Sequence, residues 1–118
     1  MPDGFTPELP VFSDIMSAVN RLAGRIVRTP LLESPLLNQR MGRRILVKPE
    51  CLQRTGSFKF RGASNKILAL GDSVKTGGVV AYSSGNHAQG VAAAAHFAGI
   101  PALIVMPSDA PAIKRANT

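Results

Sequence analysis

The most constraining feature of the sequence is a pair of apolar, strand-like runs separated by one helix-like run. Val79–Tyr82 and Ala102–Met106 are nearly continuous apolar segments, of the kind that parallel sheets bury on both faces. The segment between them, 87–98, is rich in alanine and stops at the Gly-Ile-Pro sequence of residues 99–101. A strand, a helix and a second strand in this order predict a right-handed crossover. We therefore expect an α/β fold, an open parallel sheet with helices on both faces.

The preceding part of the chain continues this pattern. Ile45–Val47 is another strand-like run, and the Lys-Pro-Glu sequence at 48–50 closes it because proline cannot donate to a sheet ladder. A helical pattern then extends from the region of Ser57 to about Leu70, where the Gly-Asp pair at 71–72 interrupts it. We expect Ile45–Val47 to be the first strand of the same parallel sheet.

Two helices are expected before that strand. The first has Ser13 as its N-cap and a stripe of apolar residues to bury: Ile15, Ala18 or Val19, Leu22 and Ile26. The second is short, with Pro35 at its first position after Ser34, and it ends near Met41 before Gly42. A short extended piece at 31–33 lies between the two helices.

A lysine stands in the first turn of the predicted helix that ends at about Leu70. The apolar spacing from Phe60 onward is that of one buried helix face, so Ser57 is the predicted N-cap and Lys59 the second helical residue. A helix N-terminus carries about half a positive charge, which disfavours an ammonium there and favours the neutral amine. A neutral lysine is the nucleophile that forms a Schiff base. A lone lysine is ordinarily a solvated surface residue, so the chemical interpretation depends on a second stretch.

That second stretch is Ser83-Ser84-Gly85-Asn86-His87, which follows the strand at 79–82 directly. Open parallel sheets bind ligands beyond the carboxyl ends of their strands. Helix N-terminal amides together with these hydroxyl and amide side chains suit a carboxylate or a phosphate. The Lys59 turn also follows a strand, so we expect both loops to face one crevice. His87 has either a ligand role there, through its backbone or ring, or none.

Familiar nucleotide and metal motifs do not account for these loops. Gly85 and Gly90 have the spacing of a phosphate loop, but Val and Ala follow Gly90 where Lys and Ser or Thr are required. The sequence has no G-x-G-x-x-G. His87 and His96 are nine residues apart on an expected helix and have no carboxylate or thiolate partner at useful spacing, so we predict no metal site.

Composition restricts the remaining function classes. The chain has 118 residues, enough for one domain, and a net charge of +7. Its basic residues are not interleaved with stacking aromatic residues, so we expect no nucleic-acid partner. No apolar run approaches the ~18 residues of a membrane span, so no membrane partner is expected. The start of the chain is unlike a signal peptide, and the single cysteine, Cys51, cannot form an internal disulfide, which favours a cytoplasmic location.

The two polar stretches together resemble a known family. Gly56–Gly62, the turn Ser83–Gly90 and Met106-Pro107 are similar to the amino-terminal part of the fold-type II pyridoxal-phosphate enzymes. Within that group the chain most resembles threonine/serine dehydratases and serine racemases, from Arg28 to its end. The resemblance implies pyridoxal 5'-phosphate as the cofactor, a small hydroxy amino acid such as threonine or serine as the substrate, and a homo-oligomer.

The same resemblance implies roles for individual residues. Lys59 is the lysine that forms the Schiff base with the cofactor, Phe58 packs against its pyridine ring, and Asn86 hydrogen-bonds the 3-hydroxyl of that ring. The loop for the substrate carboxylate consists of Ser83, Ser84, Gly85, Asn86 and His87. Ser84 is in addition the acid or base opposite the lysine, as in the members that resemble serine racemase.

The implied function is that of an ammonia-lyase. Lys59, displaced by the substrate amine, removes the α-proton, and loss of the β-hydroxyl gives a 2-oxo acid and ammonia. The alternatives are a serine racemase or a β-replacement synthase of the same fold, and a non-catalytic module that binds anions.

The resemblance also implies a division into domains. We expect a proline-rich leader at 1–12, an amino-terminal arm of the large domain at 13–48, and most of the small α/β domain at 49–118. Family members are far longer, so the chain is expected to be a fragment with little or no activity alone. The phosphate-binding loop, the partner of the pyridine nitrogen and any divalent-cation site are expected beyond Thr118. Apolar surface should then remain exposed.

Overall fold

The computed structural model describes residues 9–118, so most of the expected leader lies outside the described residues. The helices are α1 (Phe12–Leu22), α2 (Pro35–Met41), α3 (Lys59–Leu70), α4 (Asn86–Ala98) and α5 (Ala112–Asn117). The strands are β1 (Leu32–Glu33), β2 (Leu46–Val47), β3 (Val79–Tyr82) and β4 (Ala102–Val105). Short 3-10 turns occupy Glu50–Leu52, Arg54–Gly56 and Gly71–Val74.

The predicted parallel pair is present. β3 and β4 pair in parallel, with Val79 opposite Ala102 and Tyr82 opposite Val105, and α4 forms the crossover between them. The two strands begin in close contact, because the Val79 amide donates to the carbonyl of Pro101 at 3.0 Å. A Cβ on Gly78 would lie 2.3 Å from that same carbonyl oxygen, and the φ of Gly78 is +70°. Only glycine fits at the entry to β3.

The prediction that Ile45–Val47 joins the parallel sheet is wrong. β2 pairs antiparallel with β1 in a separate two-stranded sheet, with Leu32 opposite Val47. The two strands are connected through α2, a short path that costs little loop-closure entropy. A side-chain contact secures it, since Oδ1 of Asn38 in α2 accepts from the Ile45 amide at 2.7 Å. The short helix itself is as predicted, with Ser34 Oγ accepting from the Leu37 amide at 3.3 Å.

The hydrophobic core lies between α3, α4 and one face of the parallel sheet. Its buried members are Phe60, Ala63 and Ile67 of α3 and Val91, Ala94 and Ala95 of α4. Phe60 is 1% exposed, and its ring meets that of Phe97 edge to face with 5.9 Å between centroids. Small side chains on α4 let the helix lie close to its neighbours, as the alanine-rich sequence predicted.

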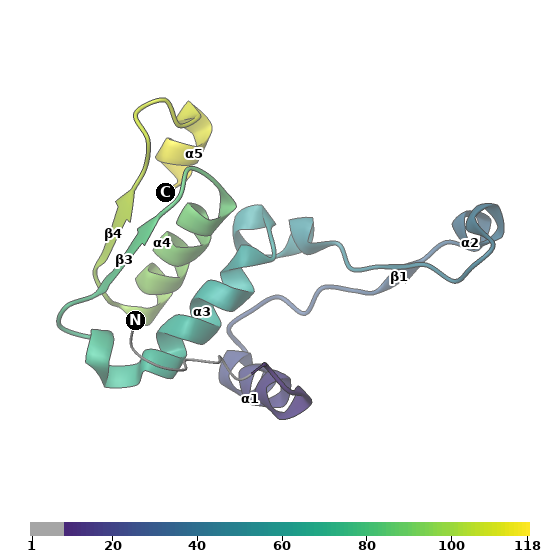
Figure 1. Cartoon of the computed structure of the whole chain (residues 1–118), viewed down its shortest axis with the longest axis horizontal. Coiled ribbons are helices and arrows are strands. Elements are labelled where there is room, and N and C mark those ends of the chain that lie inside the picture. Colours follow the sequence, from purple (N-terminus) through teal and green to yellow (C-terminus); the bar gives the residue numbers. More distant parts are fainter. Residues whose placement is uncertain (1–8) are drawn as a thin grey trace, which may run out of the picture.

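The other face of the parallel sheet is bare. Val80 and Tyr82 of β3 are 72% and 85% exposed, and Leu103 of β4 is 62% exposed. Figure 1 shows α3 and α4 on one side of the sheet. Within residues 9–118, helices therefore cover one face, and the expected cover of the second face is not seen. The exposed apolar surface that the sequence predicted is present.

The first helix differs from its prediction in where it begins and in how much of its apolar stripe is buried. α1 begins at Phe12 rather than after Ser13, and the Val11 amide donates to the carboxylate of Asp14 at 2.8 Å. Of the predicted buried stripe only Leu22 is buried, whereas Ile15 and Val19 are more than half exposed. The reason is that α1 packs chiefly against α3, so the rest of its apolar face has no neighbour.

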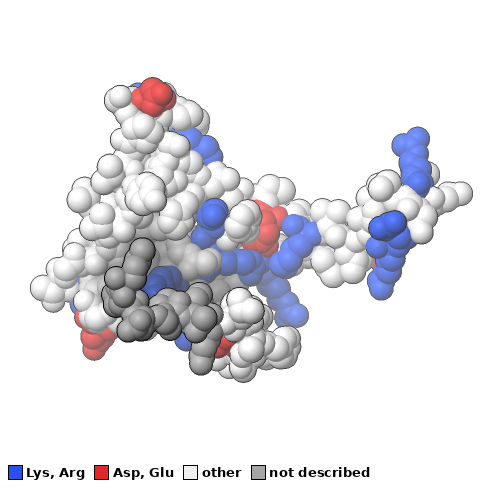
Figure 2. Space-filling view, viewed as in Figure 1, with Lys and Arg blue, Asp and Glu red and all other residues white. Residues whose placement is uncertain are grey.

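The segment that carries β1, α2 and β2 projects from the core as an arm (Figure 1). The radius of gyration is 17.5 Å, larger than the roughly 13–14 Å expected for a compact chain of this length. Figure 2 shows Lys and Arg side chains at the tip of the arm and at its base. Within residues 9–118, no helix combines the length and apolar character that crossing a membrane requires.

Candidate active site

Lys59 opens α3 at the end of a tight turn. Ser57 is extended (φ −155°, ψ 161°), Phe58 already has helical angles (φ −65°, ψ −15°), and Ser57 Oγ accepts from the Lys59 amide at 3.4 Å. Ser57 therefore contacts the start of the helix as expected, but α3 begins at Lys59 with Phe58 as its N-cap, so Lys59 is the first helical residue and not the predicted second. The Lys59 side chain is exposed, with Nζ 5.2 Å from the centroid of the Phe58 ring. An amine and an aromatic ring thus share one exposed surface.

The turn just before Lys59 is strained. Thr55 has φ 63° and is the one non-glycine residue with positive φ among residues 9–118. Its hydroxyl oxygen is buried and has no hydrogen-bond partner in that part of the chain. Strained backbone and unpaired buried polar atoms of this kind concentrate at functional sites.

The second predicted stretch lies at the carboxyl end of β3, as expected. The Ser83 amide donates to the Val105 carbonyl at 3.0 Å, which attaches this loop to the end of β4. Ser83 Oγ accepts from the Gly85 amide at 3.2 Å, and α4 begins at Asn86. The side chains of Ser84, Asn86 and His87 are exposed. The loop therefore presents polar side chains and the first amides of α4 to solvent.

Gly90 brings the two stretches together. It is buried in α4, and a Cβ at this position would lie 3.1 Å from the carbonyl carbon of Lys59 and 3.2 Å from the amide nitrogen of Phe60. The first turns of α3 and α4 therefore meet backbone to backbone. Sequence reasoning tested Gly90 only as part of a phosphate loop. A glycine inside an alanine-rich helix was the available signal for this close approach.

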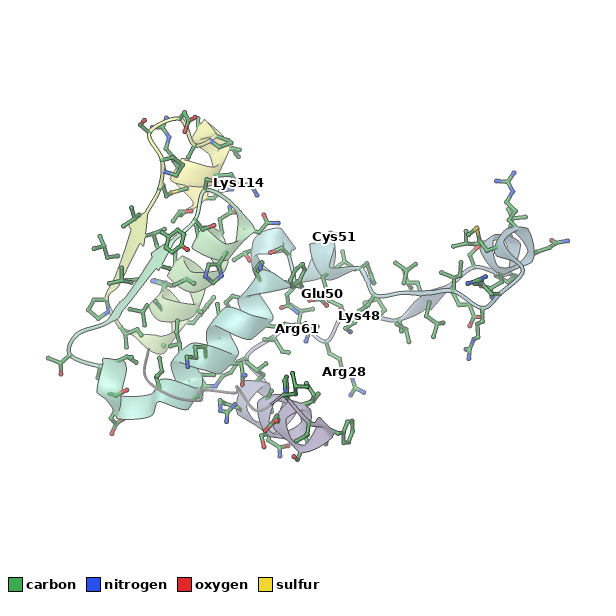
Figure 3. The ribbon with its side chains drawn as sticks, in the orientation of Figure 1. Arg28, Lys48, Glu50, Cys51, Arg61 and Lys114 are labelled. Carbon is green, nitrogen blue, oxygen red and sulfur yellow. The ribbon has the colours of Figure 1, made fainter. Side chains whose placement is uncertain are left out.

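A network of polar side chains, which sequence reasoning missed, holds the start of α3. Figure 3 shows Glu50 and Arg61 at the base of the arm. Nε and Nη2 of Arg61 donate to the two carboxylate oxygens of Glu50 at 2.7 and 2.8 Å, and the Thr29 hydroxyl donates to Glu50 at 2.6 Å. The hydrogen bonds from Arg61, more than any other contact, lower the pKa of Glu50 from 4.5 to about 2. Glu50 is therefore ionised throughout the neutral range.

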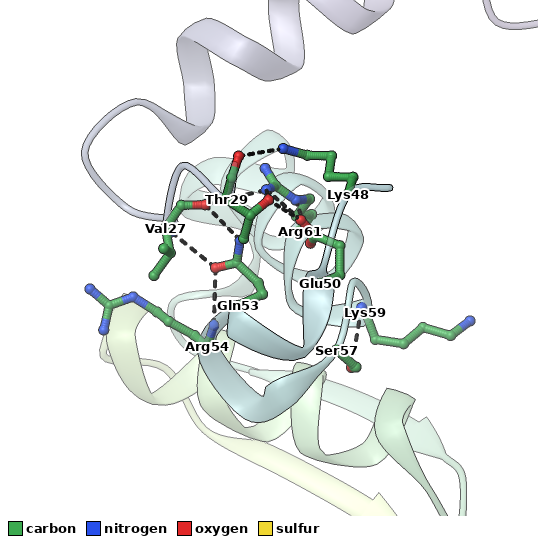
Figure 4. A network of polar contacts seen from close by, with 9 residues as sticks. All are labelled: Val27, Thr29, Lys48, Glu50, Gln53, Arg54, Ser57, Lys59 and Arg61. Atoms are coloured by element: carbon green, nitrogen blue, oxygen red, sulfur yellow. Dashed lines mark hydrogen bonds and ion pairs between the residues drawn. The ribbon is translucent and has the colours of Figure 1, made fainter. Parts of the chain in front are cut away.

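The network joins three separate segments of the chain (Figure 4). The Gln53 side chain pairs with the backbone of Val27, accepting from its amide at 3.0 Å and donating to its carbonyl at 2.8 Å. Lys48 Nζ donates to the Thr29 carbonyl at 2.9 Å. Figure 4 shows the Lys59 side chain directed away from this network. The network therefore supports the backbone around Lys59 without using its amine.

A second lysine contacts the other loop. Lys114, in α5, places Nζ 2.6 Å from Oδ1 of Asn86 and 3.1 Å from Oε1 of Gln89. Gln89 is 7% exposed. Nothing in the sequence pattern indicated this contact, because it depends on how the chain returns after β4.

Comparison with known proteins shows the family of the chain. Residues 22–118 match the family described as pyridoxal-phosphate dependent enzyme. The chain is 48% identical over 110 residues to L-threo-3-hydroxyaspartate ammonia-lyase of Saccharomyces cerevisiae, covering 93% of this chain and 34% of that protein. It is 49% identical over 114 residues to the catabolic L-threonine dehydratase of Escherichia coli K12, covering 96% and 35%.

A solved structure shows the same fold. The structure of maize serine racemase superposes with a TM-score of 0.84 at 48% sequence identity, covering 89% of this chain and 32% of that one. The chain thus spans about a third of the length of the relatives it matches.

Proposed function

The chain belongs to the family of pyridoxal-phosphate-dependent enzymes, and from that premise we propose that it carries the cofactor lysine and the substrate loop of a threonine/serine dehydratase. Enzymes of this family use pyridoxal 5'-phosphate. The proposed reaction removes the α-proton and the β-hydroxyl of a small hydroxy amino acid, giving a 2-oxo acid and ammonia. Relatives named as hydroxyaspartate ammonia-lyase and threonine dehydratase support this reaction class.

The residues proposed for the site have the chemical groups that the cofactor needs. Lys59 supplies an amine for its aldehyde, Phe58 an apolar wall for its ring, and Asn86 an amide for its ring oxygen. The buried hydroxyl of Thr55, without a partner in residues 9–118, is a further polar atom in the turn before the lysine. When bound, the cofactor supplies an electron sink for the charge that proton removal leaves on the substrate α-carbon.

Each proposed role uses a group that the structure places on the two loops. Nζ of Lys59 takes the α-proton, and the Ser84 hydroxyl acts as the acid or base on the opposite face. Backbone amides at the start of α4, together with Ser83, Gly85, Asn86 and His87, bind the substrate carboxylate, since a helix N-terminus favours an anion. The partly buried Arg61–Glu50 pair keeps the lysine-bearing turn in place.

The contact of Gly90 with the peptide of Lys59 is the observation that carries this proposal. A lysine and a carboxylate-binding loop can act on one substrate only if their elements lie side by side, and the backbone of Lys59 lies so close to Gly90 that a Cβ there would be 3.1 Å from the Lys59 carbonyl carbon.

A serine racemase is the second candidate. It is supported by Ser84 in the loop and by the similarity to maize serine racemase. We also propose that residues 13–48 and 49–118 belong to different domains of the whole enzyme, which the projecting arm supports, and that the whole enzyme is a cytoplasmic homo-oligomer.

The test uses two proteins. One is the 118-residue chain with added pyridoxal 5'-phosphate, for which we expect little 2-oxo acid because it spans about a third of its relatives. The other is the E. coli threonine dehydratase with the segment matching residues 22–118 replaced by this chain. We expect that chimera to release 2-oxo acid from threonine, serine or 3-hydroxyaspartate, and Lys59→Ala to abolish the release.

Two outcomes of this test would oppose the proposal. A folded chimera that binds the cofactor through Lys59 but releases no 2-oxo acid from any of the three substrates would exclude the dehydratase. Formation of D-serine as the main product, lost in Ser84→Ala, would favour the racemase instead.

A further inference from the structure

We propose that Lys114 is a positioning residue that fixes the side-chain amide of Asn86, so that its N–H donor is presented to the ring oxygen of the cofactor. This inference rests on the proposed function of the Lys59 site and deepens it. Lys114 belongs to neither of the two loops from which the site was predicted. Figure 3 shows it beside the start of α4, at the opposite end of the molecule's body from α1.

The orientation of the amide follows from the chemistry of lysine. An ammonium donates hydrogen bonds and accepts none, so the atom of Asn86 that lies 2.6 Å from Nζ must be the oxygen. The Nδ2 group of Asn86 is then directed elsewhere, and no described residue accepts a hydrogen bond from it. A lone amide can turn over and present either atom to a ligand, whereas an amide held by an ammonium presents only its donor.

A second amide holds the lysine itself. Nζ also donates to Oε1 of Gln89 at 3.1 Å, and Gln89 is 7% exposed in the first turns of α4. Lys114 is partly buried, whereas Asn86 is exposed. The ammonium therefore bridges a buried residue and the exposed edge of the site.

This position is electrostatically unfavourable for a lysine unless the contacts compensate. The N-terminal end of α4 carries partial positive charge, which repels an ammonium. Two charge-assisted hydrogen bonds offset that repulsion. The same ammonium adds positive charge beside the loop proposed to bind the substrate carboxylate, and it is therefore compatible with an anionic ligand.

The donor is the atom that a ring oxygen needs. A phenolic oxygen that accepts a hydrogen bond from a fixed N–H is favoured in its deprotonated form, because the hydrogen bond stabilises the charge. With Lys114 in place, the energetic cost of orienting the Asn86 amide is paid before the cofactor binds. Without Lys114, the Asn86 amide would be free to turn over and present its oxygen, in place of its N–H donor, to the ring oxygen of the cofactor.

The experiment compares Lys114→Met with wild type in the 118-residue chain, and Lys66→Met is the matched control. Methionine has nearly the shape of lysine but no donor. Lys66 is exposed on α3 and makes no hydrogen bond or ion pair with the described residues. The first readout needs no cofactor: the two Nδ2 proton resonances of Asn86, assigned by their loss in Asn86→Asp. We expect them to shift toward the values of a free amide in Lys114→Met and to stay unchanged in Lys66→Met.

The second readout is binding of pyridoxal 5'-phosphate to the chimera with the E. coli enzyme, which supplies the phosphate-binding loop expected beyond Thr118, followed by its absorption spectrum across a range of pH. We expect the dissociation constant to rise roughly three- to tenfold in Lys114→Met, the effect of one hydrogen bond. The spectrum of the bound cofactor should also change its pH dependence, which a purely structural role would not cause. Lys114→Arg keeps a donor-only cation and should restore most of the affinity. Asn86→Asp keeps the contact with Lys114 but lacks the donor, and it should bind as weakly as Lys114→Met.

The outcomes separate this inference from the proposed function. If Lys59→Ala binds the cofactor with the same affinity and the same spectrum as wild type, the proposed function is refuted, and the role of Asn86 is refuted with it. If binding depends on Lys59 but Lys114→Met matches Lys66→Met in affinity and spectrum, the role of Lys114 alone is overturned. An unchanged Asn86 amide resonance in Lys114→Met would overturn it as well, without reference to the cofactor.

Discussion

Replacing Glu50 by glutamine should destabilise the chain in a way that depends on pH. The carboxylate of Glu50 accepts two hydrogen bonds from Arg61 and one from Thr29. Its side chain is 16% exposed and that of Arg61 is 26% exposed, so solvent screens the pair only partly. Glutamine keeps the shape but carries no charge, and its NH₂ group would face donors. The Arg61 guanidinium would remain partly buried without its counter-ion.

The size of the effect follows from the pKa of Glu50. A folded-state pKa of about 2, against an ordinary value of 4.5, corresponds to roughly 3 kcal/mol of stability at neutral pH. Glutamine can still accept one N–H, so we expect Glu50→Gln to lower the free energy of unfolding by about 2–3 kcal/mol at pH 7. Because the pKa is lower in the folded state, this contribution is complete above pH 4.5 and disappears as the pH falls toward 2.

Urea unfolding followed by circular dichroism between pH 7 and pH 3 measures this directly. The difference between wild type and Glu50→Gln should be constant above pH 5 and shrink below it. Glu33→Gln is the matched control, because Glu33 also pairs with an arginine, Arg44, but at the exposed tip of the arm. Glu33→Gln should lower the free energy of unfolding much less than Glu50→Gln does. A loss for Glu50→Gln that is independent of pH, or an equal loss for Glu33→Gln, would refute the ion-pair argument.

Two further substitutions test the turn and the helix contact around Lys59. Gly90→Ala should lower the free energy of unfolding by about 1 kcal/mol, because its methyl group would press on the Lys59 backbone. The control is Gly62→Ala, in open space on α3, which should raise the free energy of unfolding by a similar amount. Equal effects of the two substitutions in denaturant titrations would argue against the close approach. Thr55→Val should stabilise by roughly 1 kcal/mol because it removes a buried hydroxyl without a partner in residues 9–118 at nearly constant shape, and a lower thermal midpoint would show that the hydroxyl is satisfied.

The sequence predicted the parts of the fold that depend on local pattern. The apolar runs at 79–82 and 102–106, with an alanine-rich segment and a glycine stop between them, are sufficient to predict the parallel pair and its crossover helix. The lysine at the start of α3 and the polar loop before α4 follow from the same pattern, because both stand where a strand or turn passes into a helix. Their assignment to specific roles came from resemblance rather than from pattern.

The sequence could not predict which segments pair over longer distances. Ile45–Val47 has the composition of a buried strand, but only two of its residues enter a ladder, and the partner is β1. The apolar stripe of α1 identifies a face but not what covers it, and most of that face is exposed. Amphipathic spacing indicates which residues share one face of a helix, but it does not indicate which other element packs on that face.

Polar contacts between distant segments were also beyond sequence reasoning. Glu50 and Arg61 are eleven residues apart, and Thr29, in the segment between α1 and β1, lies further upstream. Arg61 offered one usable signal, because an arginine in the first turns of a core helix requires a partner to be partly buried. Lys114 offered none, since its contact with Asn86 depends on the path of the chain after β4.

The central claim is that Lys59 is the residue to which the cofactor attaches. The most direct test is to incubate the chimera of this chain and the E. coli enzyme with pyridoxal 5'-phosphate, reduce the adduct with borohydride, and locate the label by peptide mass spectrometry. The chain has four other lysines, Lys48, Lys66, Lys75 and Lys114, which serve as internal controls for nonspecific reaction. We predict one dominant label on Lys59, absent in Lys59→Ala. A label spread evenly over the five lysines, or retained in that variant, would contradict the account.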